Sequence, residues 1–259
     1  MYTAMLIAAS GIQRQQRRMD EISHNVANVN TVAFKTSRLD FKDAMYTAGL
    51  TPAQPRTPEG NQQRGNGVMV AGATKNFSVG IIRGTDRPLD VAIEGEGFFS
   101  LEDASGTTVY TRAGNFYFGV DEDGYTSWLV NGEGHWVLDA DGARIQVPDG
   151  TTLTEIDENG VITFTAGGEM TVVPLGIFTF RNVTGLLALG GGSYLESEAS
   201  GERLPVEGVR IRQGAIEGSN VDLSEQMTLL IRTQRAFSLA SRALTTADEM
   251  EGIANNMRR

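Results

Sequence analysis

The sequence predicts an α+β protein in which helices at the two chain ends pair as an antiparallel coiled-coil stalk and the middle forms an antiparallel β-rich body, sandwich or barrel-like. Two observations predict this class. Apolar residues recur every seven residues at both ends, and short middle stretches alternate apolar and polar residues between turn signals. The predicted segments are an N-terminal helical segment (1–35), a linker and extended arm (36–75), a central β domain (76–212) and a C-terminal helical segment (213–259).

The N-terminal segment has the pattern of one amphipathic helix. Its heptad core positions fall at 5, 12, 19 and 26 and at 8, 15, 22 and 29, and only Gln15 interrupts them. Arginines 14, 17 and 18 lie on the opposite face, as expected for a helix with one buried side. The residues of this seam that we expect at subunit contacts are Met5, Ile12, Met19, Ile22, Val26 and Val29.

The same helix is predicted to end within NVANVNT, residues 25–31. Asparagine side chains can bond the last free backbone groups of a helix, and asparagine tolerates left-handed conformations. The apolar Phe34 follows, and we expect it to anchor the chain where it crosses to the β body.

The middle of the chain begins with a predicted loop and continues with β-rich stretches. Residues 49–67 contain three prolines and four glycines and almost no apolar side chains, which indicates a loop or extended arm. The stretches that follow have the alternation of half-buried strands. They are NFSVGIIRG, LDVAIEGEGFFSL, TVYTRAGNFYFGV, TSWLVN, HWVLDA, RIQVPDG, GVITFTA and MTVVPLGIFTF.

Three acidic turns, DEDG, DADG and DENG, begin 18 residues apart at Asp121, Asp139 and Asp157. This period indicates a β-meander with a glycine-dependent turn on the same edge after every second strand. A calcium loop is the alternative interpretation, but the helical type needs a third ligand before the glycine and a bidentate glutamate after it. None of the three turns supplies them.

The C-terminal segment predicts a second long helix, capped at Ser219, Asn220 or Asp222. A second apolar row at 229, 236 and 243 lies on a different face from the main seam, so one partner helix cannot cover both rows. An ordinary helical hairpin would explain the periodicity alone, but we expect the stalk to complete its core against other copies of the chain. Polar Gln15, Gln234 and Ser241 are candidates for setting the register. The expected contact residues are Leu223, Met227, Leu230, Gln234, Phe237, Leu244 and Met250.

Composition and charge exclude several classes of protein. The net charge of −10 argues against nucleic-acid binding, and the absence of cysteine excludes disulfides and thiolate sites. The short apolar run at the N-terminus fits neither membrane insertion nor a cleaved signal.

His24 and His135 lack a triad or ligand set, and EGEGFFS carries two glutamates that would repel a phosphate. We therefore expect no enzyme activity, no cofactor and no metal.

These segments together resemble the bacterial flagellar axial proteins, in particular basal-body rod proteins of the distal-rod type. The resemblance continues through TPEGNQQRGNGVMV (57–70), RPLDVAIEGEGFFSL (87–101), YTRAGNF (110–116), QGAIEGSNVDLSEQM (213–227) and TQRAFSLASRALTTADEM (233–250). Ala33 stands where the family's N-terminal motif usually has glycine, so either the backbone has no positive φ there or it adopts one under mild strain. The residues that match the N-terminal motif are Ala27, Asn28, Asn30, Thr31, Phe34 and Lys35.

The resemblance implies a structural subunit that is exported by the flagellar type III apparatus. It would polymerise through its terminal helices into the extracytoplasmic rod that carries torque from motor to hook. Its partners would be other copies of itself, other rod and hook proteins and the export apparatus. Two alternatives stay open: another axial component, either proximal rod or hook protein, and a secreted β-rich calcium-binding or adhesive module.

Overall fold

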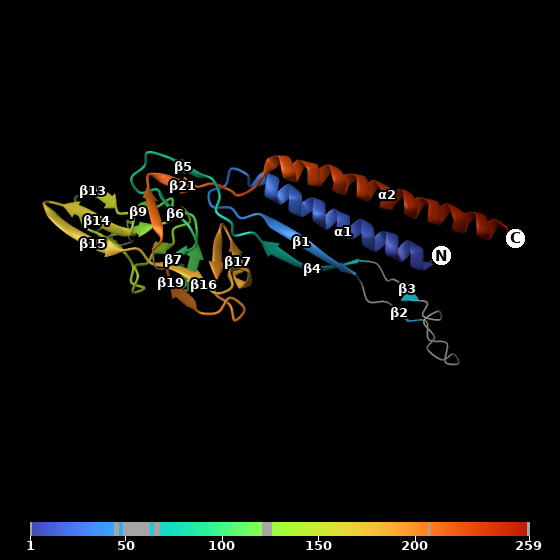
Figure 1. Cartoon of the computed structure of the whole chain (residues 1–259), viewed down its shortest axis with the longest axis horizontal. Coiled ribbons are helices and arrows are strands. Elements are labelled where there is room, and N and C mark those ends of the chain that lie inside the picture. The colour runs from blue at the N-terminus through green and yellow to red at the C-terminus, as the bar shows by residue number, and fades with distance from the viewer. Residues whose placement is uncertain are drawn as a thin grey trace. The chain divides into compact units, whose positions relative to one another are not determined.

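The computed structural model describes residues 2–43, 47–48, 63–64, 68–120, 126–206 and 208–257. The chain forms two compact units (Figure 1). The first unit comprises Met1–Ala27, Ser37–Lys75 and Asp222–Arg259, and the second comprises Asn28–Thr36 and Asn76–Val221.

The first unit contains both long helices, α1 (Tyr2–Ala27) and α2 (Leu223–Asn256). They lie side by side and antiparallel, drawn in blue and red in Figure 1. Strands β1 (Ser37–Asp43) and β4 (Val68–Lys75) form an antiparallel pair that contacts α1, and β2 (Thr47–Ala48) pairs with β3 (Gln63–Arg64). Apart from Gln63 and Arg64, the loop predicted over 49–67 lies outside the described residues.

The ends of the helices agree with the sequence prediction. Helix α1 ends at Ala27, and the Thr31 N–H donates to the Asn28 carbonyl at 3.1 Å in the turn that follows. Asp222 is the N-cap of α2, because its carboxylate accepts the N–H groups of Ser224 and Glu225 at 2.8 and 3.1 Å. Neither helix is both long and apolar enough, within the described residues, to cross a membrane.

The second unit contains the β body. Its elements are β5 (Ile82–Gly84), β6 (Val91–Glu94), β7 (Phe98–Glu102), β8 (Thr108–Thr111), β9 (Tyr117–Val120), β10 (Ser127–Val130), β11 (Trp136–Val137), β12 (Gln146–Val147), β13 (Thr151–Ile156), β14 (Val161–Ala166), β15 (Glu169–Pro174), β16 (Ile177–Phe180), a 3-10 turn (Val183–Gly185), β17 (Leu187–Gly190), β18 (Ser193–Leu195), β19 (Arg203–Pro205), β20 (Arg210–Gln213) and β21 (Ala215–Glu217). Each stretch that the sequence marked as β-rich contains at least one of these strands.

All the strand pairs of this body are antiparallel among the described residues. Seven strands run in the order β12-β10-β11-β7-β8-β18-β17, and β9, β16 and β19 complete this 10-stranded sheet. A separate sheet has the order β13-β14-β15, and β20 pairs with β6 and β21 with β5. The α+β class with a large antiparallel body is therefore confirmed.

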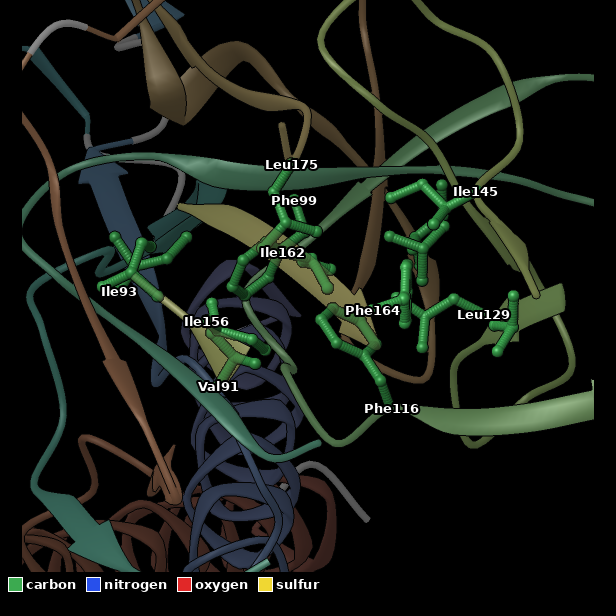
Figure 2. Close-up of a cluster of buried hydrophobic side chains, with 14 of the residues drawn as sticks. Val91, Ile93, Phe99, Phe116, Leu129, Ile145, Ile156, Ile162, Phe164 and Leu175 are labelled. Atoms are coloured by element: carbon green, nitrogen blue, oxygen red, sulfur yellow. The ribbon is translucent and has the colours of Figure 1, made fainter. Parts of the chain in front are cut away.

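The core of the body follows from the alternation of side chains along each strand. In β14, for example, Ile162 and Phe164 are buried while their neighbours are more exposed. Figure 2 shows how Phe99, Phe116 and Ile162 gather with other apolar side chains in the main cluster. The rings of Phe99 and Phe116 pack edge to face with centroids 5.2 Å apart. A second cluster contains Phe98, Tyr110, Phe178, Phe180 and Tyr194.

The acidic turns do not repeat along one edge as predicted. The turn at Asp139 lies beside the 10-stranded sheet, whereas the turn at Asp157 joins β13 to β14 in the separate sheet. Both aspartates bond their own turns: Asp139 accepts the N–H groups of Asp141 and Ala143, and Asp157 accepts that of Glu158. The equal spacing therefore reflects similar turn chemistry and not a single meander, and the turn at Asp121 lies outside the described residues.

Candidate functional site: a buried charge cluster where three motifs meet

Three charged side chains that are distant in sequence meet inside the second unit. The Lys35 Nζ lies 2.5 Å from Glu217 Oε1, and the Arg112 Nε lies 2.6 Å from Glu217 Oε2. The exposed fractions of the three side chains are 0% for Lys35, 2% for Arg112 and 0% for Glu217. We call Lys35, Arg112 and Glu217 the charge cluster.

Local backbone structure brings each member of the charge cluster into place. Glu217 is the last residue of β21 and pairs with Ile82 of β5, and Arg112 directly follows β8. Lys35 is fixed through Ala33, whose N–H donates to the Glu217 carbonyl at 2.8 Å. Ala33 has a φ of 54° and is only 1% exposed. Alanine therefore adopts the left-handed conformation, which is the second of the two alternatives that the sequence left open, at a cost of roughly 1–2 kcal/mol.

The charge cluster is satisfied by hydrogen bonds as well as by charge. Both oxygens of Glu217 accept ionic donors, and its Oε1 also accepts the Gly80 N–H at 2.8 Å. The Lys35 ammonium donates to the Ser78 carbonyl at 2.6 Å. The Arg112 guanidinium donates to the carbonyl oxygens of Ile93, Gly95 and Gly97 at 3.3, 2.9 and 2.9 Å. These four carbonyls offset the excess of one positive charge.

The two glycines of EGEGFFS, Gly95 and Gly97, lie against the charge cluster and contact it through their carbonyl groups. Gly95 and Gly97 have φ values of 139° and 145°, which a residue with a side chain rarely adopts. Their carbonyl oxygens accept hydrogen bonds from Arg112. These two carbonyl groups therefore act as acceptors for a cation.

Burial and the neighbouring charges shift the pKa values of Lys35 and Glu217 in opposite directions. Burial lowers the pKa of Lys35, although Glu217 counteracts part of this effect. Burial alone would raise the pKa of Glu217, but Arg112 and Lys35 outweigh it and hold that pKa below 4.5. Burial, together with the nearby Glu217 charge, raises the pKa of Tyr194 to about 12.

A second polar contact lies in the first unit, between the helices. Asn25 is 2% exposed, and its Nδ2 donates to the Gln226 Oε1 at 3.2 Å and to the Ser37 carbonyl at 2.8 Å. The Ser37 N–H returns a bond to Asn25 Oδ1 at 3.1 Å. This contact joins α1, α2 and the start of β1, and sequence reasoning missed its Gln226 member because Gln226 lies off the predicted seam.

Gln15, Gln234 and Ser241, which the sequence proposed for setting the register of the helices, differ in their exposure in the single chain. The Oε1 of Gln15 is buried without a hydrogen-bond partner among the described residues. Gln234 is exposed, and Ser241 is half-buried. Their predicted role in a polymer stays a prediction.

The predicted contact residues divide into two groups in the single chain. Ile22 is buried, and a second set is half-buried: Met5, Ile12, Met19, Val26, Val29, Leu230, Phe237 and Leu244. Leu223, Met227 and Met250 are 44%, 45% and 51% exposed, and Gln234 is exposed as well. The structure also exposes apolar side chains that are not among the predicted contact residues, namely Leu6, Ile7, Ile231, Leu239, Ile253 and Met257.

The charge cluster has the chemistry of a structural site. Its three side chains are almost completely buried and are bonded to one another and to backbone groups. His135 lies near Glu133, with 3.9 Å between Nδ1 and Oε2, and His24 lies in α1. Within the described residues, no group of three or more histidine, cysteine or acidic side chains could hold a metal ion.

Comparison with known proteins gives the family. Models described as flagella basal body rod protein, flagellar hook protein FlgE/F/G D1 domain and flagellar basal body rod FlgEFG protein C-terminal match residues 5–35, 92–164 and 212–257. The chain is 37% identical to the flagellar basal-body rod protein FlgG of Borreliella burgdorferi, over 100% of both chains. The chain belongs to the FlgG family of flagellar basal-body rod proteins.

Other FlgG proteins are similarly close to this chain. That of Bacillus subtilis is 35% identical over 100% of both chains, and that of Agrobacterium fabrum is 34% identical over 97% of this chain and 98% of its own. The family resemblance inferred from the motifs is confirmed. Each of the three matched regions contains one member of the charge cluster, in the order Lys35, Arg112 and Glu217.

Proposed function

We propose that this FlgG-family chain is a structural subunit of the flagellar basal-body rod, where it helps to carry torque from the motor to the hook. The observation that carries the proposal is the 37% identity to a flagellar basal-body rod protein FlgG over the whole of both chains. Matches to a rod-protein model at one end and a FlgEFG model at the other support it. The chain would act in the basal body, outside the cytoplasm.

Assembly is proposed to occur through the two helices. In this proposal α1 and α2 form an antiparallel coiled coil whose outer face contacts further copies of the chain. Exposed Leu223, Met227 and Ile231 on α2 support such a contact, because large apolar side chains on a helix surface gain stability when a neighbour covers them. Contacts between different surfaces that do not close into a ring generate a helical polymer.

Partners, export and domain organisation belong to the same proposal. The chain would bind other rod and hook proteins and leave the cell through the flagellar type III apparatus, with no cofactor and no catalytic role. The segments 1–35, 36–75, 76–212 and 213–259 would act as the N-terminal helical segment, arm, β domain and C-terminal helical segment. The alternative is another axial component, either a proximal rod protein or a hook protein. Two of the matching family models support this alternative, because their descriptions also name FlgE and FlgF.

The experiment that tests assembly is Met227→Asp, expressed in a strain that lacks the chromosomal gene. Met227 is 45% exposed in the single chain, so the variant chain should fold normally, but an aspartate would lie unpaired in a dry contact between subunits. We expect truncated rods without hooks in electron micrographs of isolated basal bodies, and loss of motility.

Thr228→Asp is the matched control, because Thr228 is exposed in the same turn of α2 and is not an apolar contact residue. This variant should build complete rods. Complete rods with hooks in the Met227→Asp strain would exclude Met227 from the subunit contact. Complete rods in the deletion strain itself would overturn the rod function.

A further inference from the structure

We infer that the hairpin of β14 and β15 inserts into an apolar hollow in the β body of a second copy of the chain. This inference rests on the proposed function and deepens it, because it names one contact between rod subunits. Both surfaces belong to the Asn76–Val221 part of the second unit. The contact therefore joins two β bodies and is additional to the one proposed for the helices.

The hollow is a mostly apolar depression in the second unit. Its volume is about 450 Å³, which is in the range of protein sites that enclose a small molecule and is large enough for one long side chain. The ring of Phe98 packs edge to face on those of Phe77 and Phe180, with centroids 5.6 and 6.1 Å apart, so this wall is already formed in the single chain. Val79 is 42% exposed, so the apolar wall reaches solvent. The residues that define the hollow are Phe77, Val79, Phe98, Phe180, Arg181 and Val183.

The hairpin of β14 and β15 presents apolar side chains that the single chain leaves uncovered. Strand β15 pairs with β14 alone and is an edge of the three-stranded sheet. Met170 lies opposite Thr165 near the turn of the hairpin and is 74% exposed, and Val172 on the same face is 59% exposed. A methionine side chain is unbranched and flexible, so it can fill an irregular apolar space. Met170 is therefore the side chain that we assign to the hollow.

The charges on the two surfaces are complementary. Residues 148–176, which include the whole three-stranded sheet, carry five acidic and no basic side chains, and one of these acids is the exposed Glu169 beside Met170. The hollow contains Arg181, which is exposed and has no ion pair among the described residues. Glu96 also lines the hollow, so Glu169 would have to enter on the side of Arg181. Such a pair at the rim of an interface fixes the orientation of the partner.

The hairpin and the hollow are different surfaces in separate parts of the body. Figure 1 shows β13, β14 and β15 at one end of the second unit and β17 at the other. Val183 of the hollow begins the 3-10 turn that leads into β17. When a hairpin enters the hollow of the next copy and the contacts do not close into a ring, one hairpin and one hollow stay free at the two ends. The same contact can then repeat along a helical polymer, as a rod requires.

The first test is cross-linking between cysteines, which is specific because the natural sequence has none. Met170→Cys and Val79→Cys are placed together in one chain, which is expressed in the strain that lacks the chromosomal gene. Isolated basal bodies are treated with a short bismaleimide and run on a denaturing gel. We expect a ladder of covalent multimers longer than dimers. Val120→Cys with Val79→Cys is the matched control, because Val120 is 66% exposed on β9, outside both surfaces, and this pair should give no ladder.

The outcomes separate this inference from the proposed function. Rods that contain the chain but give no ladder with Met170→Cys and Val79→Cys would overturn the inference and leave the rod function in place. A ladder with the Val120→Cys control pair as well would also overturn it. Isolated rods that do not contain the chain would overturn the rod function itself.

The second test is an exchange of charge between Glu169 and Arg181. Arg181→Glu should lower the number of basal bodies with hooks, because it places two carboxylates together, and Glu169→Arg should do the same with two cations. The double variant, Glu169→Arg with Arg181→Glu, should restore the hooks. Arg210→Glu is the control, since Arg210 is exposed on β20 of the same body, and it should leave the hooks unchanged. A double variant no better than the single variants, or an Arg181→Glu strain with as many hooks as the control, would overturn the inference.

Discussion

Replacing Glu217 by glutamine should destabilise the second unit far more than the removal of any other single charge in the described part of the chain. Glutamine has nearly the same shape as glutamate, so the substitution removes the charge and leaves the packing. Lys35 and Arg112, both almost fully buried, would then face a neutral amide. The amide also has one oxygen acceptor where Glu217 has two, so its NH₂ group would point at one of the two cations.

The magnitude follows from the burial of the pair. Breaking a buried ion pair by removing one partner costs about 3–5 kcal/mol, and the total stability of a domain is only about 5–15 kcal/mol. Two cations lose their counterion here, so we expect a loss of about 4 kcal/mol or more. The loss at the half-buried pair of Glu102 and Arg144, whose side chains are 20% and 37% exposed, is expected to be smaller.

The assay is equilibrium unfolding in urea followed by tryptophan fluorescence. The two tryptophans of the sequence, Trp128 and Trp136, lie in β10 and β11, so the signal reports on the second unit alone. The unfolding midpoint of Glu217→Gln should fall sharply while that of Glu102→Gln stays close to the natural protein. A loss below about 1 kcal/mol in Glu217→Gln would show that the charge cluster is not a main source of stability.

Three further outcomes are expected. Lys35→Met should cost less than Glu217→Gln in the same assay, because Glu217 keeps Arg112 as its counterion; a loss as large as that of Glu217→Gln would contradict this. The pKa of Glu217 is lowered, so the stability that its charge contributes is present above about pH 4.5 and is lost as the pH falls through the lowered pKa. The stability difference between the natural protein and Glu217→Gln should therefore shrink as the pH falls below about 4.5. A difference that stays constant would rule out the charge as its cause. Gly114→Ala should destabilise by about 3 kcal/mol or more, because a Cβ there would lie 1.8 Å from the Val91 carbonyl oxygen. Gly84→Ala, with no atom nearer than 3.8 Å, is the control and should change the unfolding midpoint little.

Local patterns in the sequence predicted the elements of the fold well. Heptads located both helices, and Asp222 proved to be the cap among the three residues considered. Alternation located the strands, because a half-buried strand needs apolar side chains at every second position. The sequence did not predict which strands pair with one another. The acidic turns were assigned to one edge of one sheet, but the turns at Asp139 and Asp157 belong to two sheets, because the residues of a turn do not specify which strands meet.

The site was only partly predictable. Lys35 appeared as a member of a family motif, and Arg112 and Glu217 lay unremarked within YTRAGNF and QGAIEGSN. Nothing in the local sequence distinguishes a buried arginine that meets a buried glutamate from two solvated surface charges. Gln226 was missed for the same reason, because its partner Asn25 lies 201 residues away.

The sequence by itself determined the helices, the β-rich middle and the family, since each depends on residues that are close together in the chain. Only the tertiary structure decided that Lys35, Arg112 and Glu217 form one charge cluster, because ion pairs 105 and 182 residues apart depend on strand pairing. It also decided the backbone of Ala33, where the bond from its N–H to the Glu217 carbonyl holds alanine at a φ of 54°. Neighbouring residues determine the local preference for helix or strand and the apolar pattern along the chain. The free energy of a charged side chain depends instead on its burial, and a side chain becomes buried only when distant segments pack together.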